Sequence, residues 1–96
     1  MKHLVVIVNP ISGRISKHRV VSRISSCIDT AKYDVTIRFT SYAGHATKIA
    51  EEAVRDGVDV VVAVVVAVGG DGTVNEVARA LVRTNTALGI IPCGSG

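Results

Sequence analysis

The stretch VDVVVAVVVAVGGDGTVNEVARALVR, residues 58–83, decides the fold of this chain. Its run of valines, which carries no charge after Asp59, predicts a β-strand that is buried on both faces, as strands of parallel sheets are. The Gly-Gly-Asp-Gly-Thr turn behind it has almost no side chains, and apolar residues at helical spacing follow. A buried strand, a glycine turn and a helix start can together bring backbone N–H groups against a phosphate.

The rest of the chain repeats this alternation of strand and helix. Short aliphatic runs alternate with segments whose apolar residues recur at i, i+3, i+4 and i+7. The βαβαβαβ order with short connections predicts an α/β fold, a three-layer domain with a parallel sheet and right-handed crossovers. Strands are predicted at residues 3–8, 34–40 (half-exposed, at an edge), 58–68 and 86–91, and helices at residues 16–28, 46–54 and 74–82.

Three local patterns refine this prediction. The apolar stripe of the first helix includes Cys27, and that of the third helix ends at Val82. Thr73 and Glu76 match a capping box, with Thr73 as the N-cap of the third helix. The tetrapeptide Val-Val-Ala-Val at 61–64 is repeated at once at 65–68, which stretches the third strand to about twice the usual length.

Length and composition limit the possibilities further. The chain has 96 residues, enough for one small domain, and three aromatic residues, so its core must be aliphatic. Cys27 and Cys93 are far apart in the sequence and match no metal-binding motif, so they are expected to be free thiols. No signal peptide or membrane span is expected, because the apolar runs are too short, and the chain is interpreted as cytosolic.

The positive charge is concentrated in one segment. Net charge is +3, and five basic or histidine residues fall close together in the first predicted helix and the loop before it. Such a segment suits phosphates, nucleic acid or an anionic membrane surface, and it is equally consistent with a solvated helix face. The residues are Arg14, Lys17, His18, Arg19 and Arg23.

The loops at the carboxyl ends of the predicted strands converge, since parallel strands end at one edge of a sheet. Asp71 is the informative residue there, because a carboxylate in a phosphate loop repels the ligand unless a divalent cation or a transferable proton accompanies it. A loop-shaping Asx-turn is the alternative. Glu76 is interpreted as a cap, and His18 and His45 as surface residues. The converging loops are Asn9–Gly13, Thr40–Gly44, Gly69–Thr73 and Pro92–Gly96.

Three ordered motifs carry a family resemblance: VVIVNPISGR (5–14), VAVGGDGTVNEVARAL (66–81) and LGIIPCGSG (88–96). Together they resemble the N-terminal half of the diacylglycerol kinase catalytic domain. The resemblance implies an ATP-dependent, magnesium-requiring lipid kinase of phospholipid metabolism, with a fold related to NAD kinases and phosphofructokinases. It also implies that residues 1–96 form a truncated ATP-binding part, whose lipid-binding, β-rich C-terminal domain is absent.

The resemblance also implies roles for individual residues. Asp71 would be the catalytic base for the lipid hydroxyl, or else a magnesium or nucleotide residue. No nucleic-acid partner is implied, and an anionic membrane is a candidate peripheral contact. The nucleotide-binding residues would be Asn9, Pro10, Ile11, Ser12, Gly13, Thr40, Gly69, Gly70, Asp71, Gly72, Thr73, Val74, Asn75 and Ser95.

Two other functions stay open at this point. The Gly-Gly-Asp-Gly-Thr turn also occurs in kinases of soluble substrates such as NAD, although the Asn9–Gly13 segment argues against that group. The Val-Val-Ala-Val repeat and the end of the sequence at Gly96 leave room for a non-catalytic nucleotide-binding fragment or anion-binding module, or for a remnant with no activity. The isolated chain is expected to bind ATP weakly and to have no kinase activity.

Overall fold

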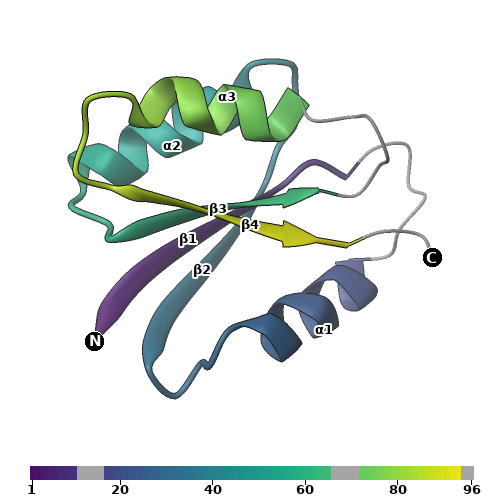
Figure 1. Cartoon of the computed structure of the whole chain (residues 1–96). Helices are drawn as coiled ribbons and strands as arrows, with labels where there is room; N and C mark the ends of the chain where they lie inside the picture. The colour runs from purple at the N-terminus through teal and green to yellow at the C-terminus, as the bar shows by residue number, and fades with distance from the viewer. Residues whose placement is uncertain (11–16, 66–71, 94–96) are drawn as a thin grey trace.

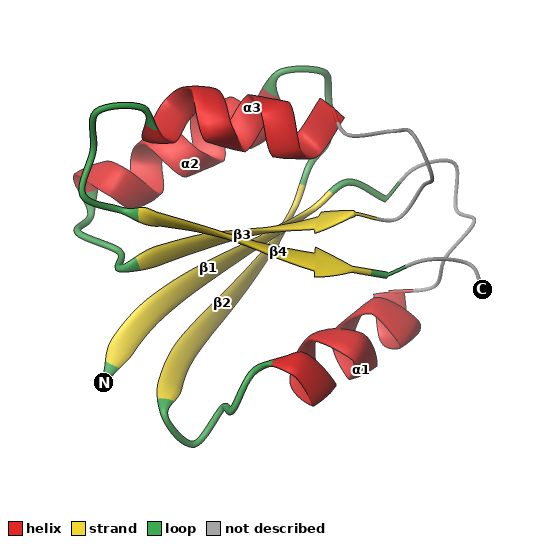
Figure 2. Cartoon of the chain, in the orientation of Figure 1, coloured by secondary structure: helices red, strands yellow, loops and turns green. Residues whose placement is uncertain are grey.

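The computed structural model describes residues 1–10, 17–65 and 72–93 of the chain. Helices and strands alternate along these residues, which confirms the predicted order (Figure 2). The strands are β1 (Lys2–Val8), β2 (Tyr33–Phe39), β3 (Val60–Val65) and β4 (Ala87–Pro92), and the helices are α1 (Lys17–Cys27), α2 (His45–Arg55) and α3 (Gly72–Leu81).

The four strands form one parallel sheet in the order β2-β1-β3-β4. The central strand β1 places Val5 opposite Thr36 of β2 and Val61 of β3. Because the chain moves from β1 outward to β2 and then back across β1 to β3, consecutive right-handed crossovers fall on opposite faces. Helix α1 covers one face, and α2 and α3 cover the other (Figure 1). The predicted three-layer α/β fold is therefore confirmed.

Alternate residues of the central strands fill two separate cores. Val6 of β1 faces α1 and packs with Val20 and Ile24 of that helix. Its neighbour Ile7 faces the other way and packs with Ile49 of α2 and with the alanines of that helix. Val6 and Ile7 are both 0% exposed, which explains why β1 shows no polar alternation in sequence.

The two edge strands differ in character. In β2, exposed and half-buried residues alternate, and the exposed ones include Asp34 and Arg38, so the predicted half-exposed edge strand is confirmed. At the opposite edge, β4 carries no charge, and its Leu88 and Ile90 are exposed. Charged residues on an edge strand hinder pairing with other chains, so only the β2 edge has this protection.

The end of α2 agrees with the sequence prediction. Gly57 has a φ of +77° and donates its N–H to the carbonyl of Val54, while the Val58 N–H donates to the carbonyl of Ala53. This pair of bonds is a Schellman motif, in which glycine tolerates the left-handed conformation. It keeps Val58 in the helix-ending turn, and β3 begins at Val60 instead of Val58.

Three other sequence predictions need correction. Cys27 is exposed at the end of α1, and the half-buried Ile28 packs on the core beyond the helix. Val82 is 63% exposed because α3 ends at Leu81. Thr73 is not an N-cap, since α3 already begins at Gly72. Strand β3 is described up to Val65, and the rest of the repeated tetrapeptide lies outside the described residues.

Candidate functional site

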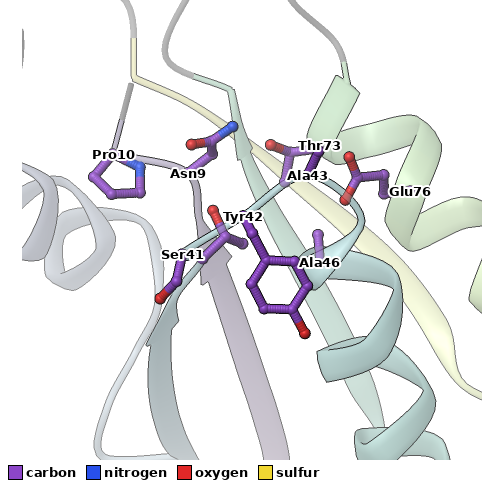
Figure 3. A pocket seen from close by; sticks show the side chains of 9 residues that line it. Asn9, Pro10, Ser41, Tyr42, Ala43, Ala46, Thr73 and Glu76 are labelled. Carbon is purple, nitrogen blue, oxygen red and sulfur yellow. The ribbon is translucent and has the colours of Figure 1, made fainter. Parts of the chain in front are cut away.

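A cavity of about 500 Å³ opens at the carboxyl edge of the sheet (Figure 3). Its lining comes from three places that are distant in sequence: the residues after β1, the segment from the end of β2 into the start of α2, and the first turns of α3. The lining residues are Asn9, Pro10, Thr40, Ser41, Tyr42, Ala43, Ala46, Thr73 and Glu76.

The strand order explains why a cavity forms here. β1 and β3 are neighbours, but α1, the helix after β1, covers one face of the sheet and α3, the helix after β3, covers the other (Figure 1). Neighbouring strands whose connections diverge in this way leave a crevice outside their carboxyl ends, where ligands of open α/β sheets bind. Asn9 and Thr73 lie on the two sides of this switch point.

Thr40 is held beside the end of β1 by the sheet itself. Its N–H donates to the carbonyl of Val8 at 2.9 Å, which extends the β1–β2 ladder one residue beyond β2. The next residue after Val8 is Asn9, so the ladder fixes Thr40 and Asn9 as neighbours at the cavity. Sheet hydrogen bonds thus set the spacing of two of the predicted nucleotide residues.

The turn between β2 and α2 forms one wall of the cavity. Gly44, the N-cap of α2, has a φ of +88°, a conformation that glycine adopts without strain. The Ser41 N–H donates to Nδ1 of His45 at 2.8 Å, and the Tyr42 and His45 rings stack with centroids 4.4 Å apart. His45, predicted to lie on the surface, is half-buried, and His18 is exposed as predicted.

Helices α2 and α3 are tied together next to the cavity. The Thr47 hydroxyl of α2 donates to the main-chain carbonyl of Glu76 in α3 at 2.8 Å. Glu76 is half-buried, and among the described lining residues it carries the only carboxylate. The sequence pattern assigned it to a cap, but its position on the lining gives it access to a ligand.

The donor set of the lining suits a hard cation that arrives with a phosphate. Oxygen atoms are available from the Asn9 amide, the Thr40 and Thr73 hydroxyls, and the Glu76 carboxylate. Mg²⁺ is commonly held by one or two carboxylates together with substrate phosphates, so these residues fit it. Within the described ranges, no group of three or more His, Cys, Asp or Glu residues could hold a metal unaided.

The structure brings together part of the predicted site. Asn9, Pro10, Thr40 and Thr73 all line the cavity. Gly72 is the exposed first residue of α3. Val74 packs on the core and Asn75 is exposed, and neither lines the cavity. The other predicted positions lie outside the described residues: Ile11, Ser12, Gly13, Gly69, Gly70, Asp71 and Ser95.

A second, smaller cavity of about 360 Å³ lies between α1 and the end of β4. Arg23 Nε donates to the Pro92 carbonyl at 3.2 Å, which joins the basic helix to the strand. The 11 residues of α1 include no acidic residue. The lining residues are Arg19, Ser22, Arg23, Ser26, Pro92 and Cys93. In the part of the chain that the structure describes, no helix is both long and apolar enough to cross a membrane.

Comparison with known proteins gives consistent matches. The diacylglycerol kinase catalytic domain family matches residues 3–96. A diacylglycerol kinase of Bacillus subtilis is 35% identical over 99% of this chain, and one of Staphylococcus haemolyticus is 34% identical over 94%. The chain covers 31% and 27% of those two proteins, so it spans roughly a third of their length.

Solved structures agree with these matches. The crystal structure of a diacylglycerol kinase from Bacillus anthracis superposes with a TM-score of 0.71 at 30% identity. The alignment covers 98% of this chain and 34% of that one. Another solved chain from the same organism gives a TM-score of 0.75 at 32% identity, over 95% of this chain and 30% of its own. Fold, motifs and similarity over nearly its whole length therefore agree that this chain belongs to the diacylglycerol kinase catalytic domain family.

Proposed function

We propose that this chain is the ATP-binding part of a kinase that transfers a phosphoryl group to the hydroxyl of diacylglycerol or a related lipid. The observation that carries the proposal is the convergence of Asn9, Thr40 and Thr73 on one cavity at the switch point of the sheet. Membership of the family supports kinase chemistry, and the names of the relatives support a lipid acceptor.

The nucleotide phosphates would lie between the loop after β1 and the start of α3. The exposed N-terminus of α3 offers backbone N–H groups and the positive end of the helix dipole, both of which favour an anion. Thr40 and Thr73 would add hydroxyl donors from two sides. The proposal extends to the adjoining positions 11–13, 69–71 and 95, which lie outside the described residues.

Magnesium would be held by Asp71 and Glu76 together with the phosphates of the nucleotide. When bound, the ion would neutralise charge that develops on the phosphates during transfer. The chain's own contribution is to align ATP with the acceptor and to stabilise charge by fixed dipoles. Asp71 would either take the proton from the lipid hydroxyl or help to hold the ion.

We propose that the lipid acceptor and the membrane are bound by surfaces other than the nucleotide cavity. The relatives are about three times as long as this chain, so we propose that a further domain supplies the lipid site. The protein would be cytoplasmic and touch anionic membranes through α1. Lys17, Arg19 and Arg23 of α1 account for the whole net charge, because the rest of the chain has eight basic and eight acidic residues.

A ligand titration tests the nucleotide site. The thermal midpoint of the purified chain should rise with millimolar ATP in the presence of Mg²⁺, and less in its absence, because only the folded state binds. NAD should produce no comparable rise. No shift with Mg·ATP would refute the proposal and favour a remnant with no activity. Phosphorylation of diacylglycerol by these 96 residues alone would refute the need for a further domain.

A further inference from the structure

We infer that His45 is a positioning residue whose side chain fixes the turn that carries Thr40 and Ser41 into the cavity. The inference deepens the proposed function, because it names what prepares that wall for the nucleotide. His45 itself is absent from the lining, so it acts through the turn and not by touching the ligand.

The geometry begins with a turn that needs support. The chain leaves the end of β2 and enters α2 within five residues, through Gly44 at a φ of +88°. Gly44 is the N-cap of α2 but has no side chain to cap the helix. Residues Thr40 to Ala43 between these points line the cavity. The shape of the wall therefore depends on whatever holds this short segment.

His45 holds the segment at two points. Its N–H donates to the Tyr42 carbonyl at 3.1 Å, and its Nδ1 accepts the Ser41 N–H at 2.8 Å. Its ring also stacks on Tyr42 with an interplanar angle of 12°. Since Thr40 is bonded to Val8 at the other end of the segment, the turn is anchored both to the sheet and to the first residue of α2.

The hydrogen bond also fixes the state of the imidazole. A nitrogen that accepts an N–H carries no proton of its own, so this hydrogen bond requires the tautomer whose ring proton is on Nε2. The Ser41 amide is consequently engaged inside the turn. The hydroxyls of Thr40, Ser41 and Tyr42 are the side-chain donors among the residues of this wall.

A turn that is already ordered binds more tightly than one that must be ordered by the ligand. His45→Phe keeps a flat ring against Tyr42 but removes the acceptor. We expect it to weaken Mg·ATP binding about fivefold, the factor that corresponds to one ordinary hydrogen bond. His45→Asn, whose amide oxygen can replace Nδ1 as acceptor, should recover most of the loss. The matched control is His18→Phe, the same change at an exposed residue of α1.

Nuclear magnetic resonance of the wild-type chain without nucleotide tests the hydrogen bond independently. We expect slow hydrogen exchange at the Ser41 amide and an unprotonated Nδ1 in the His45 ring. His45→Phe should lose the protection at Ser41, and His45→Asn should restore it. A fast-exchanging Ser41 amide, or a proton on Nδ1, would overturn the inference whether or not ATP binds.

The binding measurement separates the two proposals. If the wild-type chain binds Mg·ATP and His45→Phe binds it equally well, the positioning role is wrong while the nucleotide site stands. If the wild-type chain does not bind Mg·ATP, the nucleotide site is wrong, and the role of His45 is reduced to shaping the turn. Should His45→Phe fail to fold, the Ser41 exchange rate and the His45 ring signals of the wild type, together with the binding by His45→Asn, still test the positioning role.

Discussion

The hydroxyl of Thr47 donates to the main-chain carbonyl of Glu76 at 2.8 Å and so joins α2 to α3 beside the cavity. Thr47→Val keeps the shape of the side chain but removes the donor. We expect the free energy of unfolding to fall by about 1 kcal/mol, the usual net value of one hydrogen bond. Thr47→Ser keeps the donor and is the control. Equal stability of the two variants in urea denaturation would contradict this role.

Glu76→Gln tests whether the carboxylate in the cavity serves a cation. The variant removes one negative charge but keeps the size of the side chain, so it should bind ATP without Mg²⁺ more tightly than the wild type does. The gain in affinity that Mg²⁺ brings should shrink. Calorimetric titration with and without Mg²⁺ measures both. Glu51→Gln is the matched control, at an exposed position of α2. An unchanged Mg²⁺ dependence would exclude Glu76 from the ion site.

Thr40→Val tests the hydroxyl that the β1–β2 ladder places at the cavity. The main-chain bond from Thr40 to Val8 is kept in this variant, so the fold should be retained. Loss of one hydrogen bond to a charged phosphate should weaken ATP binding by about tenfold or more. The control is Thr36→Val, at an exposed position of β2, the strand that Thr40 follows. If both variants bind alike, Thr40 does not contact the nucleotide.

The basic face of α1 can be tested with vesicles. Replacing Lys17, Arg19 and Arg23 by Gln should abolish most binding to vesicles that contain anionic lipid, since each basic residue near such a surface contributes about 1 kcal/mol. Binding by the wild type should fall as salt is raised. Co-sedimentation is a suitable measurement.

The control for that experiment removes the same charge elsewhere. Lys48, Arg55 and Arg79 are exposed on the helices of the opposite layer, and their replacement by Gln gives an equal net charge. If both triple variants lose vesicle binding equally, net charge and not the α1 face is responsible.

Deleting residues 65–68 tests the repeated tetrapeptide. The buried β3 residues all belong to the first copy, Val61 to Val64, so the core on both faces should survive the deletion. We expect a cooperative thermal transition with a midpoint within a few degrees of the wild type. A variant that fails to fold would show that the second copy, of which Val65 pairs with Pro92, is a structural requirement.

The fold was predictable because each element carries its own signal. β1 and β3 are continuous aliphatic runs, β2 alternates, and α2 ends at an Asp-Gly pair whose glycine adopts the left-handed conformation that ends helices. The errors fall at ends of elements: Val58 lies before the first residue of β3, and Val82 lies after the last residue of α3, although both are apolar. Hydropathy does not record where the hydrogen bonding of a helix or strand begins or ends.

The site was predictable only where residues follow a strand directly. Asn9 and Thr40 could be placed because parallel strands end together. The role of His45 depends on one nitrogen reaching back four residues, and that of Glu76 on the way α3 docks against α2. The His45 bond is the local geometry of one turn, whereas the docking of α3 on α2 is tertiary geometry, and a histidine or glutamate at a helix start gives no separate sign of either.

The central position of β1 has a consequence for the order of folding. β1 can pair with β2 early, but its pairing with β3 brings Leu4 to Val60, and closing so long a loop is slow. The cavity needs residues that follow β1 and β2 as well as residues of α3, which comes after β3, so it is complete only after this second pairing. A nucleotide bound there would be absent from the folding nucleus. It should therefore lengthen the lifetime of the native state by slowing unfolding, and leave the folding rate unchanged.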